Sequence, residues 1–457
     1  MRPGRPHLRK VLFVAYAFPP LGAVGSLIAS QTVKYLGRHG WQAIVLTVRP
    51  EYHRGRPLDP SLLEDLPATV RIERTATVAR RRREGRGAAA APAQPPRGPR
   101  VVRRLLAALL SPVRWLASVL VNPDEYVLWV PFAVVAGLRI IRSEGVEAIY
   151  ARSQPASSLI VGRILKRLTG TPLVVELGDY WTLAGHRRWR SAAQRRIQQR
   201  QERGVLESAD AITASFDTAM YQEAYPQLRD RFRLMMLGFD REEFAAGAAP
   251  RSDRFDLTYV GKISGEQYPV EPLFQALRSA QVPGLRLTIL GSADAACRDA
   301  VERLGVKDIV SFEGFVNHKT AVHRMCGANG LLLIINDSKD NFDTNYSTKL
   351  FEYLAAGRPI LALVPGRGRA ATLITRTGAG VVCSPRDPVA IAAGLKAVYG
   401  MGAAWRAPSR EAFAEFDKDI IVGRLASILD EIVAAREGAA RPPFHAAAPP
   451  GGPRSDS

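Results

Sequence analysis

Residues 347–363 read STKLFEYLAAGRPILAL and carry the strongest indication of both fold and function. The pattern predicts a short helix that hydroxyl side chains can cap, that ends at Gly357, and that leads through Pro359 into an apolar strand. Lys349 and Glu352 are three residues apart, so their side chains lie on nearly the same side of the helix. The start of a helix attracts a diphosphate, and a carboxylate accepts hydrogen bonds from ribose hydroxyls. The segment therefore suits a sugar nucleotide, although a solvated lysine and glutamate on an ordinary helix would show the same spacing.

The composition is ordinary for a globular protein, but the charge is not. The 457 residues are 47% hydrophobic and 23% charged, and a chain of this length is expected to fold as two or more domains. The formal net charge is +20, and arginines supply most of the excess, in residues 80–83, 97–104 and 187–203. Such clusters indicate either a polyanionic partner or a solvated segment of biased composition.

The cysteines and the start of the chain indicate the compartment. Cys297, Cys326 and Cys383 are far apart and form no CxxC or Cys/His pattern, which favours a reducing environment and argues against a structural metal. Residues 1–10 are basic and lead straight into a predicted strand, so no secretory signal is visible. We therefore expect a cytoplasmic protein.

No segment has the length and composition of a membrane span. Residues 105–121 are apolar but contain Pro112 and Arg114, and residues 127–138 are too short to cross. A helix that lies on the inner face of a membrane remains an interpretation, and burial of its apolar face in the protein's own core competes equally. The basic residues that would face anionic headgroups are Arg100, Arg103, Arg104 and Arg114.

Strand and helix patterns alternate along the chain in two successive series. The first runs through residues 8–245, with a flexible insertion at about 84–100, and the second through residues 250–405. Repeated strand–helix–strand units imply two doubly wound parallel sheets of the α/β class, with ligand in the crevice where strand ends meet. An amphipathic helix at 406–436 is expected to pack back on the N-terminal domain, and residues 437–457 are expected to be disordered.

Several segments together resemble glycosyltransferases of family 4. They are residues 347–363, residues 10–26 (KVLFVAYAFPPLGAVGS), residues 174–181 (VVELGDYW), and shorter matches at 238–240, 259–262 and 378–382. The resemblance covers about residues 11–433 and rests on their order and spacing. It implies the GT-B architecture, in which two Rossmann-like domains face each other across a cleft. It also implies a nucleoside-diphosphate sugar as donor, with no bound cofactor and no metal.

The resemblance assigns the donor side of the cleft. The loop after the first strand departs from the GxGxxG pattern of dinucleotide sites, and in the family it faces the donor diphosphate and the acceptor. Lys262 matches a cation that neutralises the leaving diphosphate; a second cation often follows near Gln267 in the family but is missing here. The expected donor-binding residues are Gly22, Gly25, Lys262, Ser347, Thr348, Lys349 and Glu352.

Glu352 matches the second glutamate of the family's Glu-x7-Glu pattern and is expected on the ribose, with an exposed side chain. The first glutamate would fall at Thr344, so this chain lacks it. Asp343 or Asn345 could reach the sugar hydroxyls instead. The departure leaves the identity of the donor sugar open.

The acceptor side is predicted from strand ends in the N-terminal series. Asp179 follows an apolar strand and could orient or deprotonate an acceptor hydroxyl, although a helix cap or an ion pair to the basic helix after it fits equally. Arg152, Ser153 and Gln154 end another strand and are expected to line the acceptor site. Asp179 and Lys262 are the candidate catalytic residues.

The resulting prediction is a glycosyltransferase that moves a hexosyl or related group to a glycan or lipid-linked acceptor, with retention of configuration, in the assembly of cell-surface polysaccharides or glycoconjugates. An epimerase or phosphorylase of the same fold is the nearest alternative. A basic nucleic-acid-binding protein is the alternative from another class. Against it, the arginine clusters lack interleaved aromatic residues and a recognisable reading module, so no nucleic-acid partner is expected.

Overall fold

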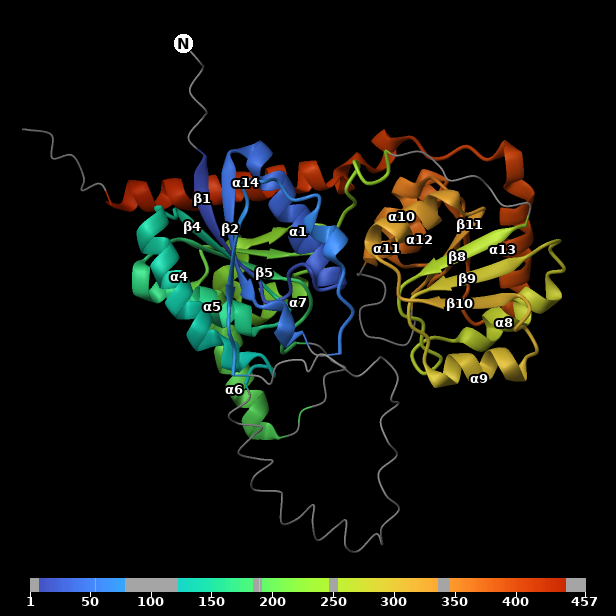
Figure 1. Cartoon of the computed structure of the whole chain (residues 1–457), viewed down its shortest axis with the longest axis horizontal. Coiled ribbons are helices and arrows are strands. Elements are labelled where there is room, and N and C mark those ends of the chain that lie inside the picture. Colours follow the sequence, from blue (N-terminus) through green and yellow to red (C-terminus); the bar gives the residue numbers. More distant parts are fainter. Residues whose placement is uncertain are drawn as a thin grey trace, which may run out of the picture.

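The computed structural model describes residues 8–53, 55–78, 122–183, 189, 191–245, 254–335 and 346–440, with the side chains of 439 and 440 left out. Two parallel β-sheets, each covered by helices on both faces, lie side by side in Figure 1. The prediction of two doubly wound α/β units is confirmed. In both units the buried strands are nearly continuous apolar runs, as parallel sheets require because both faces are covered.

The N-terminal sheet has the order β3-β2-β1-β4-β5-β6-β7. Its register pairs Val11 with Ala43 on one side of β1 and with Ala148 on the other. The chain order therefore reverses between β1 and β4, which in such sheets is the switch point where ligands bind. The strands are β1 (Arg9–Val14), β2 (Trp41–Val48), β3 (Arg71–Thr75), β4 (Ala148–Arg152), β5 (Leu173–Leu177), β6 (Ala211–Ala214) and β7 (Phe232–Leu234).

Helices cover the N-terminal sheet on both faces. One face packs on α4 and α5 through side chains such as Ile140 and Leu165, and the other packs on α1 and on the C-terminal helix α14. The α-helices are α1 (Val24–Leu36), α4 (Val130–Glu144), α5 (Ser157–Thr169), α6 (Ala192–Ser208) and α7 (Ala219–Ala224). The 3-10 helices are η1 (Gly37–His39), η2 (Pro50–Tyr52), η3 (Pro60–Leu63), η4 (Val127–Trp129) and η5 (Pro226–Arg231).

The C-terminal sheet repeats this plan with the order β10-β9-β8-β11-β12-β13. Its switch point lies between β8 and β11, and helices α10, α11 and α12 cover the face opposite α8, α9 and α13. The strands are β8 (Asp256–Val260), β9 (Arg286–Leu290), β10 (Val310–Gly314), β11 (Gly330–Ile334), β12 (Ile360–Leu363) and β13 (Gly380–Cys383). The helices are α8 (Val270–Ser279), α9 (Ala295–Arg303), α10 (His318–Gly327), α11 (Thr348–Ala356), α12 (Arg369–Thr377), α13 (Pro388–Met401) and η6 (Gly402–Ala404).

The chain returns from the second unit to the first through its last helices, η7 (Arg410–Phe416) and α14 (Lys418–Ala440). Leu425 and Leu429 of α14 lie in the same core cluster as Val11 and Phe13 of β1. The single helix predicted at 406–436 is divided into these two helices. Non-helical backbone at Phe413 and an extended Asp417 interrupt it, and the Asp417 carboxylate accepts the Asp419 N–H at the start of α14.

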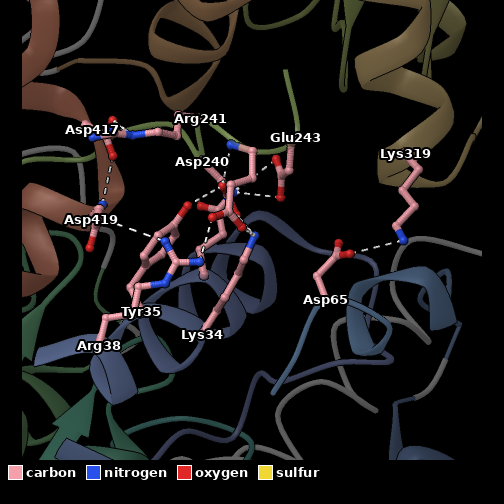
Figure 2. Close-up of polar contacts among 12 residues, drawn as sticks. Lys34, Tyr35, Arg38, Asp65, Asp240, Arg241, Glu243, Lys319, Asp417 and Asp419 are labelled. Carbon is pink, nitrogen blue, oxygen red and sulfur yellow. Dashed lines mark hydrogen bonds and ion pairs between the residues drawn. The ribbon is translucent and has the colours of Figure 1, made fainter. Parts of the chain in front are cut away.

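The segment that links the two units is held by a polar network (Figure 2). Asp240 is fully buried and accepts hydrogen bonds from Tyr35 Oη at 2.5 Å and Lys34 Nζ at 2.6 Å, both on α1. Arg241 pairs with Asp417 before α14, and Lys319 of α10 reaches Asp65 at 3.2 Å. These contacts tie α1, the link and the start of α14 together, and they hold α10 against the segment after η3.

Candidate functional site

A pocket of about 580 Å³ opens at the carboxyl ends of β1, β4 and β5. It therefore lies at the switch point of the N-terminal sheet, where the topology predicts a ligand. Its wall includes the start of α1, the loop before α5, the residues after β5, and Thr348 at the start of α11 from the other unit. The predicted acceptor-side residues and Asp179 all line it, together with Gly25 and Thr348 from the predicted donor set.

Arg152 shapes the pocket wall through contacts with the protein itself. Its side chain is 5% exposed, and its Nε lies 2.8 Å from an oxygen of Glu176, whose side chain is equally buried. Arg152 Nη1 donates to the Gly25 carbonyl at 2.7 Å, and Tyr150 Oη donates to Glu176 at 2.6 Å. The guanidinium thus ties the end of β4 to β5 and to the first turn of α1.

Ser153, Gln154 and Asp179 continue the same wall. Ser153 Oγ accepts the Gly178 N–H at 2.8 Å, which holds the loop after β5 against the loop after β4. Asp179 is exposed on the pocket side and accepts the Tyr180 N–H at 2.9 Å, while Gln154 Nε2 donates to it at 3.4 Å. A carboxylate in this position can accept a hydrogen bond from a hydroxyl that enters the pocket.

Sequence reasoning missed the support of this wall by Glu202 on α6. Glu202 is fully buried and accepts hydrogen bonds from Thr182 and from Tyr221 Oη, the latter at 2.7 Å. Tyr221 Oη in turn accepts the Trp181 N–H, so a buried carboxylate positions the aromatic residues after Asp179. Burial raises the pKa of Glu202. The sequence of the arginine-rich helix α6 gave no signal that Glu202 has this role.

The glycines of the loop after β1 have different surroundings. The Gly22 N–H donates to the Pro57 carbonyl at 2.9 Å, and a Cβ at Gly22 would lie 2.8 Å from the Phe315 ring of the other unit. Gly22 therefore allows close packing of the two units. Gly25 is the second residue of α1 and lines the pocket, where N–H groups of the first turn have no intrahelical partner.

The Tyr259 hydroxyl links the Lys262 backbone and the Lys349 side chain at the switch point of the second sheet, and neither lysine is among the residues that line the pocket. Lys262 follows β8 and is exposed, and the Tyr259 hydroxyl donates to its carbonyl at 2.8 Å. Lys349 is on the first turn of α11, and its Nζ lies 2.7 Å from Tyr259 Oη and 4.2 Å from that ring's centre. Gly261 has φ of +113°, and a Cβ there would lie 2.8 Å from Lys349 Cε. Burial lowers the pKa of Lys349 to about 8.

Glu352 lies one turn further along α11 and is only 7% exposed, so the expectation of an exposed side chain is wrong. His318 of α10 and Glu243 of the linking segment are close enough for their charges to act on Glu352. These two segments therefore lie near its side chain. Burial raises the pKa of Glu352, and the neighbouring His318 and Lys349 oppose that shift. Ser347 precedes α11 without the predicted side-chain cap; its carbonyl accepts the Leu350 N–H at 3.0 Å.

Contacts between the units close one end of the crevice. His318 Nε2 lies 2.8 Å from Glu243, and the His318 N–H donates to Asp59 at 2.6 Å. The hydrogen bond to Glu243 raises the pKa of His318 to about 9 against the opposing effect of burial. The imidazolium is therefore charged at neutral pH and helps to hold α10 against the N-terminal unit. No sequence spacing indicated this pairing.

Several predictions concern residues outside the described ranges. Asp343, Thr344 and Asn345 fall there, as do the insertion at 84–100 and the segment 100–121. Within the described part of the chain, no group of three or more His, Cys, Asp or Glu side chains could hold a metal ion. Among the helices in those ranges, none is long and apolar enough to cross a membrane.

Comparison with known proteins supports a glycosyltransferase. Residues 254–400 match the model of the family "Glycosyl transferases group 1". The matched region is the second sheet with its helices, and it contains Lys262, Lys349 and Glu352. A search of curated protein sequences finds no match to this chain.

Solved structures with the same fold align over nearly the whole chain. Sucrose-phosphate synthase from Thermosynechococcus elongatus is 17% identical with a TM-score of 0.60, and 93% of this chain and 100% of that one are covered. HepE from Anabaena, bound to UDP and glucose, is 16% identical with a TM-score of 0.59 and the same coverage. The N-terminal domain of trehalose-6-phosphate phosphatase from Candida albicans is 13% identical with a TM-score of 0.57, covering 94% and 98%. The chain has the GT-B fold, and its C-terminal unit matches a glycosyltransferase family.

Proposed function

We propose that the protein is a family 4-like glycosyltransferase that moves a sugar from a nucleoside-diphosphate sugar to a glycan or lipid-linked acceptor, with retention of configuration. The observation that carries the proposal is the pairing of two helix starts across the crevice. The first turn of α1 contributes Gly25 to the pocket, and the first turn of α11 contributes Thr348 from the opposite side. Such ends attract anions through free N–H groups and the helix dipole, which suits a diphosphate placed between them.

The donor side supplies the remaining charge for this proposal. Lys262 is exposed near the start of α11, and Lys349 lies one position after Thr348 with a buried ammonium. A diphosphate that reaches Lys349 would favour its charged form, because an opposite charge raises the pKa of an amine. Glu352 is one helical turn further on and is largely shielded from solvent. In this proposal its carboxylate accepts hydrogen bonds from the ribose hydroxyls.

The proposed reaction needs no enzymic nucleophile. The acceptor hydroxyl oxygen forms a bond to the anomeric carbon on the face from which the diphosphate leaves, while the bond between that carbon and the phosphate oxygen breaks. A diphosphate oxygen takes the hydroxyl proton, and Lys262 stabilises the negative charge that develops on the leaving group. Asp179, exposed in the pocket, would orient the acceptor hydroxyl by accepting its hydrogen bond. In this scheme the two lysines and the helix starts take the place of a metal.

A lipid-linked acceptor would bring the protein to the inner face of a membrane. The sequence of residues 100–121, outside the described ranges, combines four arginines with an apolar run. Each basic residue near an anionic leaflet contributes about 1 kcal/mol, and salt screens that attraction. Neutralising Arg100, Arg103, Arg104 and Arg114 should shift the protein from floating anionic liposomes to the supernatant. A wild-type protein that does not bind them at low salt would argue for a soluble acceptor.

A screen of sugar nucleotides by thermal denaturation tests the donor proposal directly. A nucleotide sugar at 100 times its dissociation constant adds about 2.7 kcal/mol to the free energy of unfolding. The donor found in this way is then incubated with protein after exhaustive dialysis against EDTA, and the products are analysed by NMR. Transfer with the anomeric configuration of the donor supports the proposal. An epimerised nucleotide sugar, or transfer that requires added metal, contradicts it.

A further inference from the structure

A cluster of three basic side chains lies beside the pocket, at the carboxyl ends of β2 and β3. His53 follows η2 after β2, Arg74 is near the end of β3, and Arg56 is in the loop between them. The cluster adjoins the pocket through aromatic rings. The Tyr16 ring lies edge-on to the His53 ring at 5.8 Å and packs on the Tyr126 ring at 4.3 Å. Tyr16, Tyr126 and Arg56 line the pocket, so the cluster borders the acceptor side.

Two polar atoms of this cluster are buried without a partner. His53 is 3% exposed, and among the described residues neither its Nε2 nor Nη1 of Arg74 has a hydrogen-bond partner. The other terminal nitrogen of Arg74 donates to the Pro19 carbonyl at 2.7 Å, which fixes the guanidinium in place. Buried donors are nearly always satisfied in folded proteins, and unpaired ones mark places where a ligand, ion or water completes the contacts. Two such atoms therefore leave the contacts of this cluster incomplete among the described residues.

The charges around the cluster leave it positive. Arg56 Nη2 donates to Tyr126 Oη at 3.0 Å, and within the described part of the chain neither Arg56 nor Arg74 forms an ion pair. Glu51 is the acidic group that favours the charged form of Arg74, and burial opposes it. Burial together with Arg56 and Arg74 lowers the pKa of His53 to about 4, so the imidazole is neutral at pH 7. Both guanidinium charges thus act on His53, and among the described residues neither has a bound counter-charge.

Nearby carboxylates are already engaged. The Asp124 carboxylate accepts the Ser157 N–H at 3.0 Å and the Ser157 hydroxyl at 2.6 Å, at the start of α5. Glu125 is hydrogen-bonded to the Tyr126 side chain, and this contact adds to burial in raising the pKa of Tyr126 to about 12. Asp124 and Glu125 both lie next to Tyr126 in the chain. Among the described contacts, neither carboxylate forms an ion pair with Arg56 or Arg74.

We propose that Arg56, Arg74 and His53 bind a phosphate group carried by the acceptor. The inference rests on the proposed function, because it names the acceptor class for the pocket described above. A phosphate offers several oxygens at once, which suits two guanidinium groups and an imidazole nitrogen in one cluster. A sugar hydroxyl held near Asp179 and a phosphate held at the cluster would then be two groups of one molecule. The phosphate belongs either to a soluble sugar phosphate or to a lipid carrier, and the test separates these sources.

Binding of inorganic phosphate, measured by calorimetry without any sugar nucleotide, tests the site itself. Arg74→Gln and Arg56→Gln should each weaken the affinity at least about tenfold, since each removes a charge-assisted contact. The control variant Arg167→Gln removes the same charge from an exposed position at the end of α5 and should change it by less than about twofold. Lys262→Ala serves to detect phosphate that binds on the proposed donor side instead. Arg56 is exposed, so its variant keeps the test decisive if Arg74→Gln does not fold.

Equal affinity in all variants, or a loss confined to Lys262→Ala, would overturn the proposal. Acceptor class is then tested with glucose 6-phosphate against glucose and with geranyl phosphate against geraniol. Binding of one phosphorylated compound at least about tenfold more tightly than its neutral form, and loss of that preference in Arg56→Gln, supports the proposal and identifies the source. No preference for phosphate in either pair overturns it. Phosphate binding at the cluster in a protein that binds no sugar nucleotide would overturn the proposed function and leave the anion site supported.

Discussion

The two walls of the crevice use charged residues in different ways. On the N-terminal wall Arg152 and Glu176 are buried together and satisfy each other, with Tyr150 and the Gly25 carbonyl completing the contacts. On the C-terminal wall Glu352 is buried and Lys349 is half-buried, and desolvation shifts the pKa of each toward its neutral form. A buried ion pair whose hydrogen bonds are all made within the protein stabilises the shape of a pocket. Desolvated charged groups with shifted pKa values are instead typical of places where a charged ligand binds. Under the proposed function, the Arg152 network fixes the shape of one side of the acceptor pocket, and the donor would complete the contacts of Lys349 and Glu352.

The largest effect is expected from breaking the closed network. Arg152→Met leaves the Glu176 carboxylate buried without its cation, which should lower the free energy of unfolding by about 3–5 kcal/mol. Urea unfolding followed by circular dichroism measures the loss. Adding Glu176→Gln to Arg152→Met should recover part of it, because the amide keeps an acceptor for Tyr150 without a buried charge. If Arg152→Met is as stable as wild type but fails to use acceptor, Arg152 acts on substrate and the contrast between the walls is wrong.

On the donor wall, Lys262→Ala tests the leaving-group role. The positive charge of Lys262 should stabilise the transition state, in which the bond to phosphate is breaking, more than it stabilises the bound donor. In Lys262→Ala, kcat at saturating donor should therefore fall by about 10²-fold with a smaller change in donor affinity. Because Lys262 is exposed, the fold should be unaffected. Exposed Lys307 on the same unit offers a matched control, Lys307→Ala. Full turnover by Lys262→Ala would remove it from the mechanism.

The sequence predicted the elements of the fold closely where apolar runs were unbroken. Residues 173–177, 211–214, 256–260 and 286–290 are strands, and each is the short, mostly apolar run that predicts a buried parallel strand. The short edge strands β3 and β7 were not predicted. Arg71–Thr75 contains three charged residues and no apolar run, and Phe232–Leu234 is too short to show a hydrophobic pattern.

The candidate site was predictable only where one segment carried the pattern. Lys349 and Thr348 follow from the helix start in residues 347–363, and Asp179 follows from the strand before it. The burial of Glu352 depends on α10 and the linking segment, which pack over it from distant parts of the chain. The same is true of Arg74 and His53, which belong to one cluster only because β2 and β3 are paired side by side. Such features depend on tertiary contacts that local spacing does not encode.

Replacing Glu352 sharpens the assignment of the donor wall. Glu352→Gln keeps the shape and removes the charge, so donor affinity should weaken by about 30-fold, or about 2 kcal/mol, as a charged acceptor of ribose hydrogen bonds is lost. Titration calorimetry with the nucleotide identified in the screen measures this. The unfolding free energy of Glu352→Gln serves as the control, because the wild-type carboxylate is buried and the neutral amide should fold at least as well. Unchanged affinity would place the ribose elsewhere.

The smallest expected effect is a pH dependence of donor binding. The pKa of Lys349 is about 8 in the free protein, and a bound diphosphate favours its protonated form. Donor affinity should therefore be constant below pH 7 and weaken as pH rises through 8, by about tenfold for each unit beyond it. In stability the sign is opposite, because the unfolded chain holds this proton up to its ordinary pKa of 10.5. The contribution of Lys349 to the free energy of unfolding should therefore increase as pH rises from 8 to 10.5.

Lys349→Met isolates this effect from the other group that titrates nearby. His318 has a pKa of about 9 and loses its ion pair with Glu243 as pH rises, which would also loosen the crevice. If Lys349 controls donor binding, Lys349→Met binds more weakly at pH 7 and shows a flat profile to pH 8.5, whereas His318→Gln keeps the wild-type slope. If His318→Gln is flat and Lys349→Met keeps the slope, closure between the units governs the pH response. The donor wall would then act through its contact with the N-terminal unit and not through the charge on Lys349.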